Sequence, residues 1–230
     1  MPQEIRTINL GGVNCFLVRT GDGFILIDTG FSTKRTELEK ELASAGCKPG
    51  NLKLILLSHG DVDHTGNAAY LREKYGARIA MHNDDSGMVE RGDMRWNRKA
   101  RPDRVSILGR FIITVLGRIM PFFERSSKFD TFKPDMYVED GHDLSSHGFD
   151  AKVIRIPGHS KGSIGILTTG GDLYCGDLFA NIGKPAPHFM IDDLAAFNAS
   201  VEKLKSLGTN TVYPGHGKPF STELFMRNYR

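Results

Sequence analysis

The stretch His59-Gly60-Asp61-Val62-Asp63-His64 constrains this chain most, because it follows directly on the apolar run from Leu52 to Leu57. An apolar run of this length that ends in a turn predicts a buried strand. Imidazole nitrogens and carboxylate oxygens are the ligands that zinc and related divalent metals prefer, and neighbouring residues can face two different ions. The fold must therefore end a buried strand at a site that holds metal.

The composition is that of an ordinary globular protein, with 40% hydrophobic and 25% charged residues. A length of 230 residues suits one large α/β domain or two small ones. The formal charge of +3 is too small to predict nucleic acid as a partner of the whole domain. Because Cys15, Cys47 and Cys175 form no CxxC pair, we expect no disulfide framework. The N-terminal residues show no signal peptide, so we expect a cytoplasmic protein.

Short strands and helices alternate along the chain in the pattern of an α/β protein. Apolar runs bounded by turn residues predict strands at 5–10, 13–18, 24–28, 52–57, 78–81, 136–139, 151–156, 164–168, 172–175 and 211–213. Helices are expected at 32–45, where Ser32 would be the cap, and at 66–75 and 193–207. Hairpins followed by strand–helix units occur twice, which predicts two mixed sheets with helices outside.

The segment from about 83 to 133 interrupts this pattern. Basic side chains gather near its start, at Arg91, Arg95, Arg98, Lys99, Arg101 and Arg104. They fit a solvated face, a contact with an anionic substrate or lipid headgroup, or, third, RNA. The apolar run from Val105 to Phe123 follows, and two arginines interrupt it. We therefore expect an amphipathic helix over the domain, as a lid, dimer surface or interfacial anchor, rather than a transmembrane span.

Clusters of polar residues follow four of the predicted strands, at 58–66, 157–160, 175–177 and 213–217. Each cluster contains a glycine, which lets the backbone approach closely. Side chains on such turns can converge at one edge of a sheet, where α/β folds usually place their sites. The clusters therefore predict one shared site.

With these clusters in this order, the chain resembles the metallo-β-lactamase superfamily, whose signature is HxHxDH followed by a distant His, an Asp and a final His. Asp28-Thr29-Gly30 also matches the early Asp-rich turn of that family. The resemblance implies an α/β (α+β) fold, a four-layer αββα sandwich of two mixed β-sheets with outer helices. It covers residues 1–230 as a single domain, with a helical, lid-like insertion at about 83–133 as its least family-like part.

Carried over by position, the resemblance implies two divalent metal ions, with zinc favoured and iron or manganese as alternatives. The first metal would be held by His59, Asp61 and His159, and the second by Asp63, His64 and His216. Asp177 would bridge both metals, and Asp28 would steady the ligand loop. A hydroxide held by the metals would attack a carbonyl or phosphoryl centre. Asp61, Asp63 and His188 are the expected catalytic residues, with His188 as a proton donor to the leaving group.

Asp61 departs from the family's pattern, which has a second histidine at this position. The ligand set then carries one negative charge more than the usual set. From this we infer a weaker Lewis acid, a higher pKa for a bound water and more tolerance of iron or manganese. An alternative is that the first site is weak or empty and that the enzyme works with one metal.

These observations predict a metal-dependent hydrolase of a small ester, lactone or thioester. The insertion at 83–133 would form the roof of the pocket and select an amphiphilic or acyl-bearing substrate. Two alternatives stay open: an oxidoreductase like the mononuclear iron persulfide dioxygenases, and a non-catalytic binding module stabilised by metal. We expect no nucleic-acid partner, whereas peripheral membrane contact and a homodimer stay open.

Overall fold

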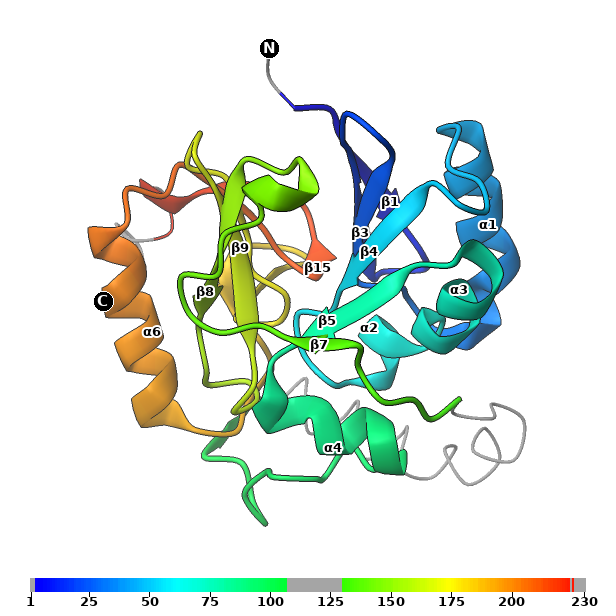
Figure 1. Ribbon diagram of the computed structural model, residues 1–230. Helices are drawn as coiled ribbons and strands as arrows, with labels where there is room; N and C mark the ends of the chain where they lie inside the picture. The colour runs from blue at the N-terminus through cyan, green and yellow to red at the C-terminus, as the bar shows by residue number, and fades with distance from the viewer. Residues whose placement is uncertain (1–2, 107–129, 224, 226–230) are drawn as a thin grey trace.

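Two β-sheets lie face to face at the centre of the computed structural model, with helices on both outer sides (Figure 1). The structure describes residues 3–106, 130–223 and 225. The first sheet contains, in hydrogen-bonded order, β1 (Ile5–Asn9), β2 (Asn14–Arg19), β3 (Phe24–Ile27), β4 (Leu52–Leu56), β5 (Arg78–Met81) and β7 (Met136–Tyr137). Its strands are antiparallel from β1 to β3 and parallel from β3 to β7.

The second sheet is also mixed. It contains, in order, β16 (Phe220–Ser221), β14 (Thr211–Tyr213), β10 (Leu173–Tyr174), β9 (Ile164–Thr168) and β8 (Ala151–Arg155). Only the pair of β10 and β14 is parallel among these described strands. Beside this sheet lie β12 (Ala186–Pro187), β11 (Phe179–Asn181) and β15 (His216–Gly217), and β13 (Met190–Ile191) pairs with β6 (Arg104–Val105).

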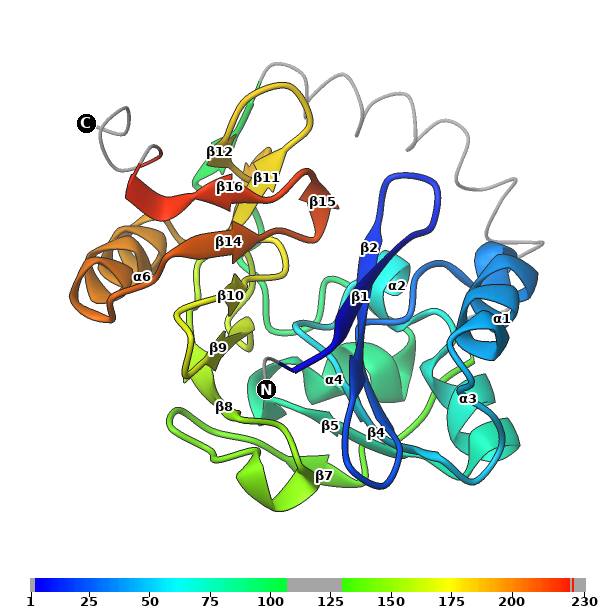
Figure 2. The same cartoon turned by 90° about the horizontal axis from the view of Figure 1, so that it is seen from above.

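Helices cover the outer faces of both sheets, as the view from above in Figure 2 shows. The first sheet is covered by α1 (Arg35–Ser44), which follows the short helix η1 (Ser32–Lys34), and by α3 (Ala68–Tyr75). The second sheet is covered by α6 (Leu194–Ser206). The remaining described helices are α2 (Val62–Thr65), α4 (Asn83–Arg91) and η2 (Ser145–His147).

Alternate residues along a strand contribute to different layers of the core. In β4, Leu54 and Leu56 pack between the two sheets, whereas Ile55 packs with the residues of α1 and α3. In β8, Val153 packs between the sheets and Ile154 packs with residues of α6. This period of two is the geometry of a strand that is buried on both faces. It produces three apolar layers, and the expected αββα sandwich of mixed sheets is confirmed.

Two helix starts differ from the sequence prediction. Ser32 does not cap a longer helix, because it lies within η1, and α1 begins only at Arg35. The helix expected at 66–75 begins two residues later, as α3 (Ala68–Tyr75), and a separate short helix, α2 (Val62–Thr65), precedes it. Between them, the Asn67 side chain donates hydrogen bonds to the backbone carbonyls of Thr29 (2.7 Å) and Phe31 (2.9 Å), which ties this break to the loop after β3.

The predicted insertion at 83–133 is described only in part. Its helix α4 lies below both sheets in the view of Figure 1, with Met88 and Val89 buried. Its strand β6 pairs with β13 near the end of the second sheet. The predicted apolar run from 105 to 123 lies almost wholly in 107–129, outside the described residues. Within the described ranges, no helix has the length and apolar character needed to cross a membrane.

Candidate metal centre

The candidate ligands follow strands whose carboxyl ends meet at one edge of the sandwich. β3 and β4 are parallel and lead into Asp28 and the loop that begins at Leu57. β8 and β10 share a direction because both are antiparallel to β9, and β14 is parallel to β10. The ends of these three strands lead to His159, Asp177 and His216. Strand direction therefore brings together residues from distant parts of the chain.

His59, Asp61 and His159 form a first cluster. Asp61 Oδ2 lies 2.9 Å from His159 Nε2 and 3.5 Å from His59 Nε2. Their candidate ligand atoms all lie within 4.8 Å of one another. Atoms that surround one zinc ion at about 2.0–2.2 Å have such a spacing, so this cluster could hold a metal.

Asp63, His64 and His216 form a second cluster with the same spacing. Asp63 Oδ2 lies 3.6 Å from His64 Nε2 and 3.4 Å from His216 Nε2. Asp63 and His216 keep about a fifth of their side-chain surface exposed, at 20% and 17%. A substrate would therefore reach the clusters from the side of these two residues.

Asp177 lies between the two clusters and presents one carboxylate oxygen to each. Its Oδ2 lies 3.8 Å from both His59 Nε2 and His159 Nε2. Its Oδ1 lies 3.4 Å from both His64 Nε2 and His216 Nε2. A carboxylate in this position could be shared by two metal ions, and the bridging role of Asp177 stays a prediction.

The Nδ1 atoms of these histidines are all engaged away from the clusters. His59 Nδ1 contacts Ser58 Oγ (2.9 Å), His64 Nδ1 donates to Asp28 (2.8 Å), and His159 and His216 donate to the carbonyls of Met190 and Gly12 (both 3.0 Å). Since the other ring nitrogen is occupied, each Nε2 is left to face the clusters. The protein thus fixes the orientation of every imidazole before any ligand arrives.

Asp28 organises the loop that carries most of these residues. Its carboxylate accepts hydrogen bonds from the backbone N–H of Ser58 (2.8 Å), from Ser58 Oγ (2.7 Å) and from His64 Nδ1 (2.8 Å). Its φ of 58° lies in the left-handed region, which Asp and Asn tolerate better than most residues. Asp28 therefore plays the supporting part that the sequence indicated.

Unpartnered polar atoms test whether these residues fit a metal ion. Among the described residues, His59 Nε2, His64 Nε2, Asp177 Oδ1 and His188 Nε2 are buried without a hydrogen-bond partner. A buried polar atom without a partner costs free energy, so such atoms are rare in the absence of a ligand. Because these atoms all face the clusters, a cation there would satisfy them together.

The carboxyl groups at the centre are held ionised. Burial opposes ionisation of Asp61, but the Arg98 guanidinium and the neighbouring histidines outweigh it and hold the pKa of that carboxyl well below its usual value. Burial likewise opposes ionisation of Asp177, yet His188, His216 and His64 keep the pKa of its carboxyl well below the usual value. Ionised carboxylates beside buried imidazoles form a site suited to cations.

His188, the candidate proton donor, lies at the first cluster. Its Nε2 is 3.2 Å from Asp177 Oδ2, and its Nδ1 is 3.1 Å from His159 Nδ1. With His159 and Asp177 it forms a further group that could hold a metal. Burial lowers the pKa of His188 to about 3, against the opposing charge of Asp177. Its position allows proton transfer and also metal ligation, and its role stays a prediction.

Arg98 is a residue of the site that the sequence did not single out. Its Nη2 donates to Asp61 Oδ1 (2.8 Å), and only 10% of its side chain is exposed. The other basic residues nearby behave differently: Arg91 stacks over Trp96 at 3.9 Å, and Lys99 pairs with Asp103 and Asp193. The sequence feature that could have pointed to Arg98 is Asp61, the extra aspartate of the motif, because a buried carboxylate needs a positive charge nearby.

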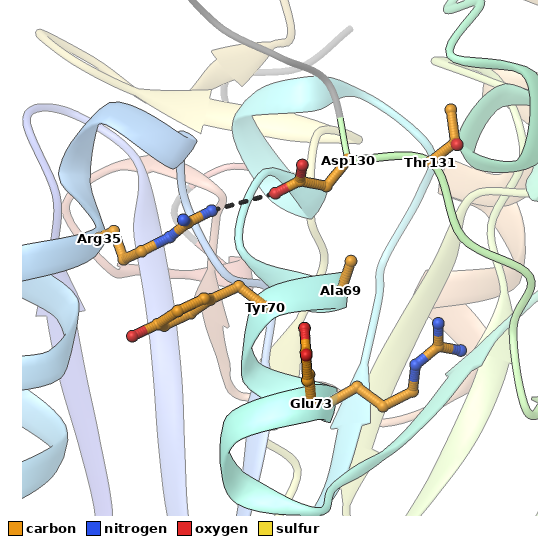
Figure 3. A pocket seen from close by; sticks show the side chains of 7 residues that line it. Arg35, Ala69, Tyr70, Glu73, Asp130 and Thr131 are labelled. Carbon is orange, nitrogen blue, oxygen red and sulfur yellow. Dashed lines mark hydrogen bonds and ion pairs between the residues drawn. The ribbon is translucent and has the colours of Figure 1, made fainter.

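A separate hollow of about 940 Å³ lies beside α3 and contains no residue of the clusters (Figure 3). It is lined by Arg35, Ala69, Tyr70, Arg72, Glu73, Asp130 and Thr131. Arg35 spans it, pairing with Asp130 at 3.2 Å while its guanidinium lies 4.1 Å from the centre of the Tyr70 ring. Arg35 pairs with Asp130, and Arg72 pairs with Asp135 outside the lining, so we assign the hollow no reaction.

Comparison with known families and proteins agrees with this geometry. A family model described as the metallo-beta-lactamase superfamily matches residues 8–216. Similar curated proteins include a probable metallo-hydrolase, YqjP, of Bacillus subtilis (23% identical, covering 93% of this chain and 69% of the relative). They also include the hydroxyacylglutathione hydrolase GloC of Haemophilus influenzae (27%, covering 73% and 69%) and the acyl-coenzyme A thioesterase MBLAC2 of Bos taurus (24%, covering 93% and 76%).

Solved structures share the fold. The metallo-beta-lactamase family protein TTHA1429 from Thermus thermophilus superposes with a TM-score of 0.70 at 22% identity, covering 98% of this chain and 79% of that one. The protein TTHA1623, solved in a di-iron-bound form, superposes with a TM-score of 0.65 at 25% identity and covers 97% of both chains.

The contacts of Asp28 predict how its replacement changes metal binding. An Asp28→Asn variant keeps a residue that tolerates the positive φ but loses one acceptor oxygen and the negative charge. We expect its affinity for divalent metal to fall by about 10–100-fold, because His64 loses the partner that orients it. Titration of the metal-free protein with zinc against a competing chelator measures the change.

The exposed Asp22, which lies in the turn before β3, supplies the matched control. Asp22→Asn should bind metal as the unchanged protein does. Equal metal affinity in Asp28→Asn and Asp22→Asn would show that Asp28 does not support the ligand loop.

Proposed function

Because the chain belongs to the metallo-beta-lactamase superfamily, we propose that this metal-dependent hydrolase cleaves a small ester, lactone or thioester, with thioesters first. The observation that carries the proposal is the pair of His/Asp clusters that share Asp177 at one edge of the sandwich. The names of two relatives, a hydroxyacylglutathione hydrolase and an acyl-coenzyme A thioesterase, support a thioester. An acyl-bearing substrate also suits the apolar part of the insertion.

Two divalent metal ions belong to this proposal. His59, Asp61 and His159 would hold one, Asp63, His64 and His216 the other, and Asp177 would be shared. When bound, the metals supply a Lewis acid that polarises a carbonyl group and lowers the pKa of a water molecule. Zinc is the favoured ion, while iron and manganese stay alternatives. The three carboxylates and the di-iron form of a related protein support those alternatives.

The side chains of the site would have different roles in the reaction. Asp63 and His216 form the partly exposed side, where the acyl group of the substrate would enter. Asp61 and Asp63 keep carboxylates beside the reacting carbon, and His188 is the proposed proton-transfer residue for the leaving oxygen or sulfur. The other two residues of the first cluster, His59 and His159, are buried, so the substrate would not approach from their side. A cytoplasmic location and a homodimer are retained as proposals.

The proposed reaction predicts a definite pattern of activity. The purified protein, loaded with zinc, should hydrolyse short acyl thioesters and simple esters or lactones, and a chelator should remove the activity. Asp177→Asn, which changes the shared carboxylate, should lower kcat/KM by about 10³-fold or more. A panel of acyl-coenzyme A, acylglutathione, p-nitrophenyl ester and lactone substrates measures this.

A fully metal-loaded protein that turns over none of these substrates would contradict the proposed reaction. Oxygen consumption on addition of glutathione persulfide, with one iron bound per chain, would instead favour the persulfide dioxygenase alternative.

The two possible roles of His188 give different results in one variant. If His188 transfers a proton, His188→Ala should lower kcat by about 10²–10⁴-fold and leave the metal content unchanged. His142→Ala, a change at a histidine outside the clusters, is the control and should leave both quantities unchanged. Kinetics and elemental analysis of the same samples distinguish the two roles. If His188→Ala loses metal together with activity, His188 is a metal ligand instead.

A further inference from the structure

Arg98 places a guanidinium group at the first metal cluster. Its Nη2 lies 2.8 Å from Asp61 Oδ1 and 3.4 Å from His159 Nε2, and its Nη1 contacts Met190 Sδ at 3.9 Å. Its Nε is buried, and the described residues offer it no hydrogen-bond partner. An arginine so buried is held by its charge interaction with Asp61 rather than by a full set of hydrogen bonds.

Other carboxylates near Arg98 have partners of their own. Asp85 accepts hydrogen bonds from the backbone N–H groups of Gly60 and Gly162 and from Ser160 Oγ. Asp192 accepts from the backbone N–H of Lys99. A guanidinium group stays protonated in proteins, so Arg98 is a permanent cation. Its direct ion-pair partner is Asp61, at 2.8 Å.

The two clusters therefore differ in charge. Asp61 is the one carboxylate that belongs to the first cluster alone, and Arg98 neutralises it. Asp63 has the same place in the second cluster, and its ion-pair contacts among the described residues are with His64 and His216. With Asp177 shared between them, the second cluster keeps one more negative charge than the first.

We propose that Arg98 is a resident cation of the first cluster, which lowers the affinity of that cluster for divalent metal and leaves the second cluster as the tight site. A fixed positive charge a few ångströms from a bound cation repels it, and burial strengthens the repulsion. Asp61 Oδ2 still faces His59 and His159, so the first cluster binds metal weakly rather than not at all. The inference rests on the proposed function only in that both clusters bind metal.

A charge effect and a positioning effect predict opposite changes. If Arg98 only orients Asp61, its removal should weaken metal binding at the first cluster. If its charge repels the metal, removal should strengthen binding there. Arg98→Met keeps the length and apolar stem of the side chain without its charge, and Arg98→Lys keeps the charge without the planar fork.

Spectroscopic titration of the metal-free protein with Co²⁺, with the bound metal counted by elemental analysis, distinguishes these cases. The unchanged protein should show two affinities that differ by about tenfold or more. Arg98→Met should raise the weaker affinity by about tenfold or more and leave the tighter one unchanged. The weaker affinity should be unchanged in Arg98→Lys. It should also be unchanged in the control Arg95→Met, which changes an exposed arginine of the same segment.

A second comparison covers the case in which Arg98→Met fails to fold. Asp61→Asn leaves Arg98 without its partner and should abolish the weaker metal binding, at the first cluster. Combining Asp61→Asn with Arg98→Met should restore this weaker binding in part. Unchanged or weaker binding in Arg98→Met, or no recovery in the double variant, would overturn the role of Arg98. A wild-type protein that binds no metal would instead overturn the proposed function.

Discussion

A buried carboxylate with imidazole nitrogens near both of its oxygens is the interaction on which the rest of the site depends. Asp177 presents Oδ2 to His59 and His159, and Oδ1 to His64 and His216. Burying these groups without partners would be costly. Hydrogen bonds at Nδ1, made by residues of the loops of both sheets, hold the imidazoles with Nε2 toward the clusters. The orientation of the candidate ligands therefore depends on the packing of the two sheets.

Much of this arrangement could be predicted from the sequence, because its signals are local. Apolar runs bounded by turns predicted the longer strands, and the polar turns that follow four of them predicted one shared site. The seven residues of the two clusters and Asp177 came from the family resemblance. The short strands β6, β11, β12, β13, β15 and β16 were not predicted, since, unlike the equally short β7, β10 and β14, they do not lie in an apolar run bounded by turn residues. Arg98 was also missed, because it reaches Asp61 across 37 positions from an insertion whose arginines suggested a solvated face.

Arg98 also changes what the substitution of Asp61 for the family's histidine means. Counting protein ligands alone indicated a more negative centre and a weaker Lewis acid. The ion pair at 2.8 Å returns the first cluster to the charge that a neutral histidine would give it. The site then differs from that of related hydrolases less in its total charge than in how the charge is distributed. The Arg98 guanidinium lies beside the first metal position, whereas the ion-pair contacts of Asp63 among the described residues are with histidines.

The central claim is that Asp177 is shared between two metal positions. Anomalous diffraction from crystals of the zinc-loaded protein, collected on both sides of the zinc absorption edge, tests it most directly. We expect two peaks, one beside each carboxylate oxygen of Asp177, with the peak among Asp63, His64 and His216 at the higher occupancy. A single peak equidistant from both oxygens, or peaks that avoid Asp177, would contradict it.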